Sequence, residues 1–70
     1  MRKFFFDIKD GVPFRDRIGI DFSGNLEAIA HCKELAQHFR DESLHDDQDL
    51  EITVVNAAGR EIYREFVHRE

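Results

Sequence analysis

The sequence contains little of what stabilises or targets many small proteins. Among its 70 residues there is one cysteine, Cys32, and one proline. A single cysteine cannot form an internal disulfide or a four-thiolate zinc site, so we expect the reducing cytoplasm as its compartment. Asp7 interrupts the phenylalanines near the start, and no apolar run reaches the length of a signal peptide or a bilayer crossing. We therefore expect no contact with a membrane.

The composition also argues against disorder. Four glycines and one proline are too few for a low-complexity chain, and hydrophobic residues, including seven phenylalanines, make up 41% of the sequence. A chain of this length buries only about 60% of the surface that it exposes when unfolded. We expect residues 1–70 to form a single domain with a thin core.

Positive charge is scarce in the middle of the chain. The formal net charge is −5, and residues 25–49 hold two Lys or Arg against seven Asp or Glu. An acidic surface repels phosphate groups, so we expect neither nucleic acid nor anionic lipid as a partner.

Two segments near the start alternate between apolar and polar residues, as half-buried strands do. They are residues 2–9 and residues 17–22. Gly11 and Pro13 lie between them and favour a turn, so the two segments are expected to pair as a β-hairpin.

Residues 25–44 follow the period of a helix. Ser23 or Asn25 can cap its first turn, and its apolar residues fall within an arc of roughly 120° that can pack on a core. This arc comprises Ala28, Ile29, Cys32, Leu35, Ala36, Phe39 and Ser43.

Residues 50–56 and 60–68 are expected to form a second hairpin. Asn56 and Gly59 fit a type I turn followed by a glycine bulge, in which Asn56 pairs with Arg60. Uninterrupted pairing from this turn sets Val54 opposite Ile62, Ile52 opposite Arg64 and Leu50 opposite Phe66. The elements together predict an α+β fold of the ββαββ pattern, with a mainly antiparallel four-stranded sheet and one amphipathic helix packed on one face. The order of the strands stays open.

Four short motifs also stand out: residues 4–11, residues 16–22 with Gly19, Leu26-Glu27-Ala28, and Ala58-Gly59-Arg60. Together they resemble a family of uncharacterised proteins of about 70–90 residues from rhizobia and related alphaproteobacteria. The resemblance implies a ββαββ module without an assigned activity, so it implies no catalytic residue. The helix departs from the family's usual Ala, Arg and Glu by carrying three histidines.

These histidines are spaced by seven residues and therefore lie in one stripe at the margin of the apolar arc. Carboxylates lie three or four residues away, within reach on a helix. This arrangement is compatible with a metal-binding or pH-responsive site, whereas a solvated polar face is the simpler interpretation. The candidate ligands are His31, Glu34, His38, Asp41, Glu42 and His45.

No pattern indicates an enzyme or a cofactor. Asp47, Asp49 and Glu51 alternate as in a calcium loop, but the glycine and glutamate that such a loop requires are replaced by Ile52 and Ala58. Cys32 falls inside the apolar arc and is expected to be a small buried hydrophobe.

The face of the sheet opposite the helix is the most informative feature. One helix covers one face, so the other must be polar or find a partner. Phe5, Val55, Tyr63 and Val67 are expected on that outer face, and such a cluster is typical of an association surface. The sequence therefore predicts a non-enzymatic interaction module that binds a protein partner or forms a homodimer; the alternative is a metal- or pH-responsive binder.

Overall fold

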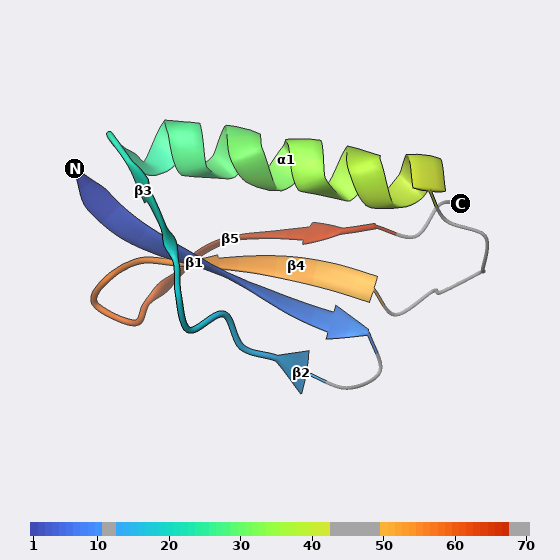
Figure 1. Ribbon diagram of the computed structural model, residues 1–70, viewed down its shortest axis with the longest axis horizontal. Coiled ribbons are helices and arrows are strands. Elements are labelled where there is room, and N and C mark those ends of the chain that lie inside the picture. Colours follow the sequence, from blue (N-terminus) through green and yellow to red (C-terminus); the bar gives the residue numbers. More distant parts are fainter. Residues whose placement is uncertain (11–12, 43–49, 68–70) are drawn as a thin grey trace.

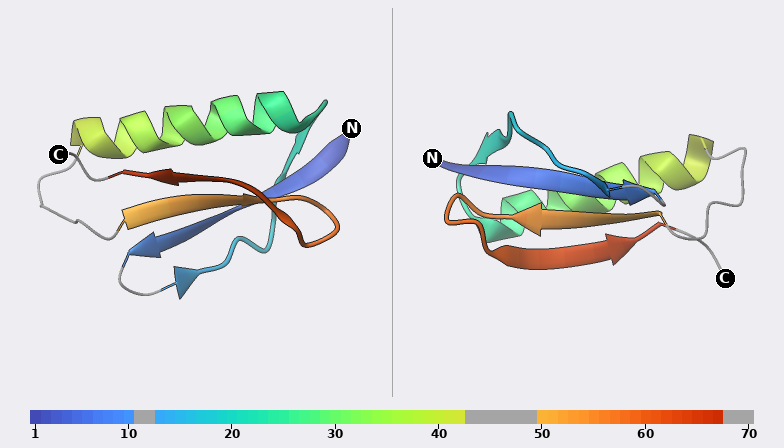
Figure 2. Two further views of the ribbon diagram at one scale, coloured as in Figure 1. Left: turned by 180° about the vertical axis from the view of Figure 1, so that it is seen from behind. Right: turned by 90° about the horizontal axis from the view of Figure 1, so that it is seen from below.

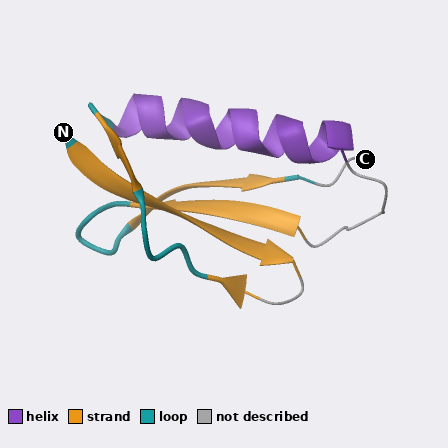
Figure 3. Cartoon of the chain, in the orientation of Figure 1, coloured by secondary structure: helices purple, strands orange, loops and turns teal. Residues whose placement is uncertain are grey.

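The structure is a computed structural model that describes residues 1–10, 13–42 and 50–67. Five strands and one helix occupy these ranges, and the helix lies along one face of the sheet (Figures 1 and 3). The predicted α+β fold is confirmed, with five strands where four were expected. The elements are β1 (Arg2–Asp10), β2 (Pro13–Phe14), β3 (Ile20–Phe22), α1 (Asn25–Glu42), β4 (Leu50–Val55) and β5 (Glu61–Phe66).

The strand β1 lies at the centre of an antiparallel sheet. The order is β2-β1-β4-β5, and β3 pairs with the first residues of β1 (Figure 2). The pairs Ile8 with Phe14 and Phe4 with Ile20 show that β2 and β3 are two parts of one returning segment. The predicted strand 17–22 is wrong in its first three residues, because the chain leaves the sheet between these two parts.

The side of α1 that faces the sheet is the predicted one. Ala28, Cys32 and Ala36 are fully buried, and Leu35 and Phe39 pack against the core. The helix matches its predicted range as far as residue 42, and residues 43 and 44 lie outside the described residues. The sheet contributes Phe4, Phe6, Ile52 and Val54 to the core, and Val67, just after β5, is also buried there.

The turn between β4 and β5 is also confirmed. The Asn56 amide donates to the Arg60 carbonyl, and the Gly59 amide donates to the Asn56 carbonyl, each at 2.9 Å. The Asn56 side-chain oxygen accepts hydrogen bonds from the amides of Ala58 and Arg60. Gly59 has a φ of 85°, which glycine adopts without steric cost.

Beyond this turn the predicted register is wrong by one residue. Val55 lies opposite Glu61, but Val54 lies opposite Tyr63, so Ile62 is the extra residue of a β-bulge. Because side chains alternate between the two faces of a sheet, one extra residue moves every later side chain of β5 to the other face. The observed pairs after the bulge are Val54 with Tyr63, Thr53 with Arg64, Ile52 with Glu65 and Glu51 with Phe66.

Candidate functional site

The outer face of the sheet contains only part of the predicted cluster. Phe5 and Val55 lie opposite each other, and both alternate with residues buried under α1, so they point away from the helix. Tyr63 packs against the core and Val67 is 4% exposed within it, so the prediction for these two residues is wrong. The bulge at Ile62 is the physical reason, since it turns Tyr63 and Val67 toward the helix.

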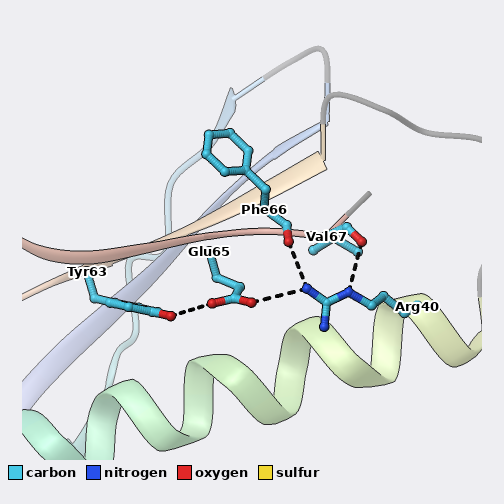
Figure 4. Close-up of polar contacts among 5 residues, drawn as sticks. All are labelled: Arg40, Tyr63, Glu65, Phe66 and Val67. Carbon is cyan, nitrogen blue, oxygen red and sulfur yellow. Dashed lines mark hydrogen bonds and ion pairs between the residues drawn. The ribbon is translucent and has the colours of Figure 1, made fainter. Parts of the chain in front are cut away.

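Phe66 takes their place on the outer face. Its side chain is 53% exposed, and Figure 4 shows its ring on the side of β5 that faces away from α1. Sequence reasoning missed Phe66 because the turn residues indicate one bulge, at Gly59, and carry no signal for the second at Ile62. Phe5, Val55 and Phe66 are called the outer-face residues below.

Charged side chains surround the outer-face residues. The Arg64 guanidinium lies 2.9 Å from a Glu61 carboxylate oxygen and 3.9 Å from Glu51 Oε1. The hydrogen bond that Arg64 donates to Glu61 and the charges of both carboxylates raise the pKa of Arg64 above its ordinary value. Glu51 Oε1 is buried and accepts no hydrogen bond from the described residues, so Arg64, at 3.9 Å, is its electrostatic partner there. The outer face is therefore a mixed surface in which opposite charges alternate around the outer-face residues.

A polar cluster joins the second half of α1 to β5 (Figure 4). Arg40 donates hydrogen bonds to the Val67 carbonyl at 3.0 Å, to the Phe66 carbonyl at 2.9 Å and to a Glu65 carboxylate oxygen at 3.1 Å. The Tyr63 hydroxyl donates to the other oxygen of Glu65. Arg40, Tyr63 and Glu65 thus connect the helix to the end of the edge strand, and we call them the helix–strand clamp.

The protonation states of this cluster favour a structural role. The hydrogen bond to Glu65 raises the pKa of Tyr63 to about 12, and the same hydrogen bond is the main cause that lowers the pKa of Glu65. Burial, with a smaller effect of the Glu65 charge, raises the pKa of Cys32 to about 11. Near neutral pH both Tyr63 and Cys32 keep their protons, so neither is an activated nucleophile or base. The prediction that Cys32 is a buried hydrophobe is confirmed.

The predicted histidine stripe is only partly exposed. The His31 ring lies 5.1 Å from that of Phe6 and 5.3 Å from that of Phe22, and it packs in a half-buried aromatic group. His38 is exposed two turns further on. In the described ranges, His, Cys, Asp and Glu side chains form no group of three that could hold a metal ion. His45 and the Glu42 side chain lie outside the part that the structure describes, as do Asp47 and Asp49 of the rejected calcium pattern.

Asp16 is a structurally important residue that sequence reasoning did not single out. Its carboxylate accepts hydrogen bonds from the amides of Phe6, Ile18 and Gly19 at 3.0 to 3.1 Å, and its own amide donates to Asp7. Burial alone would raise the pKa of Asp16, but these three hydrogen bonds outweigh burial and lower it. Phe6 lies between the residues of β1 that pair with β2 and those that pair with β3. Its amide therefore donates its hydrogen bond to the Asp16 carboxylate and not to a strand on this side. The signal in the sequence is the spacing from Asp16 to Gly19, whose φ is 78°.

A groove of about 450 Å³ lies beside the first residues of β1. Arg2 and Lys3 are its charged residues, and no carboxylate, imidazole or thiol lines it together with them. General acid–base or nucleophilic chemistry needs such a pair within hydrogen-bond reach, so this groove does not offer it. Its remaining lining residues are Met1, Phe4, Asn25, Asn56, Ala57 and Ala58.

Comparisons with known proteins identify a family but no function. In the described ranges, the helix is not long and apolar enough to cross a membrane. No curated protein and no solved structure matches the chain. A family model described as a domain of unknown function, DUF6894, matches residues 3–67. Because this match covers nearly all of the fold described above, the chain belongs to the DUF6894 family.

Proposed function

We propose that the chain is a single-domain, non-enzymatic interaction module of the cytoplasm that binds a protein partner or a second copy through the outer face of its sheet. The observation that carries this proposal is the exposed ring of Phe66 on the face that α1 leaves uncovered. Phe5 and Val55 lie on the same face, nearer the other end of β4. The pair of Thr53 and Arg64 lies between them and Phe66. Protein interfaces combine apolar and charged side chains, as this face does.

The family assignment is compatible with this proposal. We propose further that DUF6894 is the group of short rhizobial and alphaproteobacterial proteins that the sequence motifs resemble. A metal- or pH-responsive function stays a prediction with less support, because His31 packs on two aromatic rings and does not share an exposed stripe with His38.

A pair of matched variants tests the outer face. Phe66→Ser removes the exposed ring, whereas Phe14→Ser removes a ring of the same kind on β2, where the residue is 68% exposed. We expect Phe66→Ser, and not Phe14→Ser, to abolish either self-association at high micromolar concentration or the capture of a defined partner protein. Sedimentation and affinity capture followed by mass spectrometry measure these outcomes.

Equal behaviour of the two variants and the unmodified chain in both assays would contradict the proposal. Circular dichroism provides the control for folding. Both side chains are largely exposed, so both variants should keep the spectrum of the parent.

A further inference from the structure

A second exposed apolar surface lies on β2 and on the segment that follows it, at the other edge of the sheet. Phe14 is 68% exposed and Ile18 is 81% exposed. These large apolar residues are exposed although residues as small as Ala28 are buried in the core. Exposed isoleucine is common on loose loops, but this segment is ordered by side-chain hydrogen bonds. The Asp16 carboxylate accepts hydrogen bonds from the amides of Ile18 and Gly19, so it holds the main chain from which the isoleucine projects.

Positive charge flanks this isoleucine. Arg15 and Arg17 are exposed, and neither forms an ion pair within the described part of the chain. The acidic residue between them, Asp16, turns its carboxylate toward the main chain and away from a partner. In a chain of net charge −5, this segment is therefore a local basic and apolar surface. We call Arg15, Arg17 and Ile18 the basic edge.

The chain carries a surface of complementary chemistry on the solvent side of α1. Leu26, Glu27, Ala30 and Glu34 are all exposed, and at 3.6 residues per turn they lie within an arc of about 100°. Neither Glu27 nor Glu34 forms an ion pair within residues 1–10, 13–42 and 50–67. Leu26, Glu27 and Glu34 combine an apolar side chain with two carboxylates, and we call them the acidic helix face.

The two surfaces lie on different parts of the molecule. α1 covers one face of the sheet and its acidic helix face points to solvent, whereas the basic edge lies on the segment that runs from β2 to β3 (Figures 1 and 2). A contact between the basic edge of one copy and the acidic helix face of another therefore joins two different surfaces. Such a heterologous contact leaves one free surface of each kind and can add further copies.

We propose that a second copy of this chain binds the basic edge through its acidic helix face, so that copies associate head to tail. Ile18 of one copy meets Leu26 of the next, and Arg15 and Arg17 face Glu27 and Glu34. The contact is small and depends on exposed charges, so association is weak and falls as salt screens those charges. The outer-face residues take no part in it, and the inference does not rest on the function proposed above.

Complementing variants provide the decisive experiment. Ile18→Asp disrupts the basic edge and leaves the acidic helix face intact. Leu26→Asp disrupts the acidic helix face and leaves the basic edge intact. Both positions are largely exposed, so both variants should fold, as circular dichroism would verify. In sedimentation at low salt, we expect the unmodified chain to form species larger than a dimer at a chain concentration of roughly hundreds of micromolar, because a contact between exposed charges is weak. Each variant alone should be a monomer.

An equal mixture of the two variants contains one intact surface of each kind. It should form a dimer of one copy each and no longer species, and the dimer should dissociate at about 0.5 M salt, where screening is nearly complete. A mixture that stays monomeric, or an unmodified chain that is monomeric under the same conditions, would overturn the proposal. Binding of the unmodified chain to vesicles of anionic lipid, lost in Ile18→Asp, would assign the basic edge to a membrane and also overturn it.

The same samples separate this inference from the function proposed for the outer face. Association that persists in both aspartate variants but disappears in Phe66→Ser would leave the outer-face proposal intact and remove the head-to-tail contact. The opposite pattern would remove the outer face and keep the contact described here.

Discussion

Asp16 and Glu65 are half-buried carboxylates at opposite edges of the sheet, and their effects on the surface are opposite. Both have a pKa below the usual value, because hydrogen bonds stabilise the charged form. Asp16 accepts from main-chain amides, so it orders a loop without covering it, and Ile18 stays exposed. Glu65 accepts hydrogen bonds from Tyr63, its neighbour on β5, and from Arg40 of α1, so it connects the strand to the helix. Asp16, whose donors are main-chain amides, thus leaves a neighbouring apolar side chain exposed. Glu65, whose donors are side chains, helps to cover the space between the helix and the strand.

The largest effect is expected for Gly19→Ala, in the loop that Asp16 orders. A Cβ atom at this position would lie 2.7 Å from Lys3 Cγ and 2.9 Å from Phe5 Cε1, and the φ of 78° adds backbone strain. We expect a loss of about 3 kcal/mol in the free energy of unfolding, measured by urea denaturation. Gly59→Ala is the matched control, because its φ is 85° in open space, and should cost about 1 kcal/mol. Equal losses at the two glycines would show that the loop does not pack closely on β1.

The next effect is expected in the helix–strand clamp. Arg40→Ala removes three hydrogen bonds and leaves Glu65 without its closest cation. Because hydrogen bonds to charged groups contribute about 1.5–3 kcal/mol, we expect a loss of about 2 kcal/mol for this partly exposed group. Arg60→Ala, at an exposed position in the turn, should change stability by less than about 0.5 kcal/mol. A similar loss for both variants would contradict the role assigned to Arg40.

The smallest effect is a change with pH that compares the two carboxylates directly. In both, the pKa is lower in the folded chain than the unfolded values of about 3.9 for Asp and 4.3 for Glu. Their contribution to stability is therefore complete above about pH 5 and is lost as the pH falls through the folded pKa values. We expect Asp16→Asn and Glu65→Gln to be less stable than the parent at pH 7, with both differences shrinking toward pH 3. A difference that stays constant over this range would show that the carboxylate charge contributes nothing.

Much of the fold could be predicted because its signals are local. The apolar arc of α1 depends on residues three and four apart, and the turn at Asn56 depends on hydrogen bonds within five residues. The break in the returning segment could not be predicted in the same way. It depends on a hydrogen bond from the amide of Phe6 to Asp16, ten residues later, and on the space that Gly19 leaves for Phe5.

The candidate surface was predicted only in part, for a related reason. Phe5 and Val55 follow from alternation along single strands and lie on the outer face as expected. Tyr63 and Val67 were misplaced because the extra residue at Ile62 reverses the faces of β5. The clamp explains why this reversal is stable, since Glu65 accepts hydrogen bonds from Arg40 and from Tyr63 on the side that faces the helix. A contact between distant segments therefore determines the orientation, and alternation along one strand cannot reveal it.

The central position of β1 also governs how the chain reaches its native state. Phe5 pairs with Val55, fifty residues later, and most of the core forms between β1, β4 and α1. Closing so long a loop has an entropic cost that must be met before the pairing contributes stability, and proteins rich in such distant contacts fold slowly. The N-terminal hairpin can form early, but its three neighbouring phenylalanines stay exposed to solvent until β4, in the last third of the chain, pairs with β1. We therefore expect folding in milliseconds or longer, with β4 docking on β1 as the step that limits the rate.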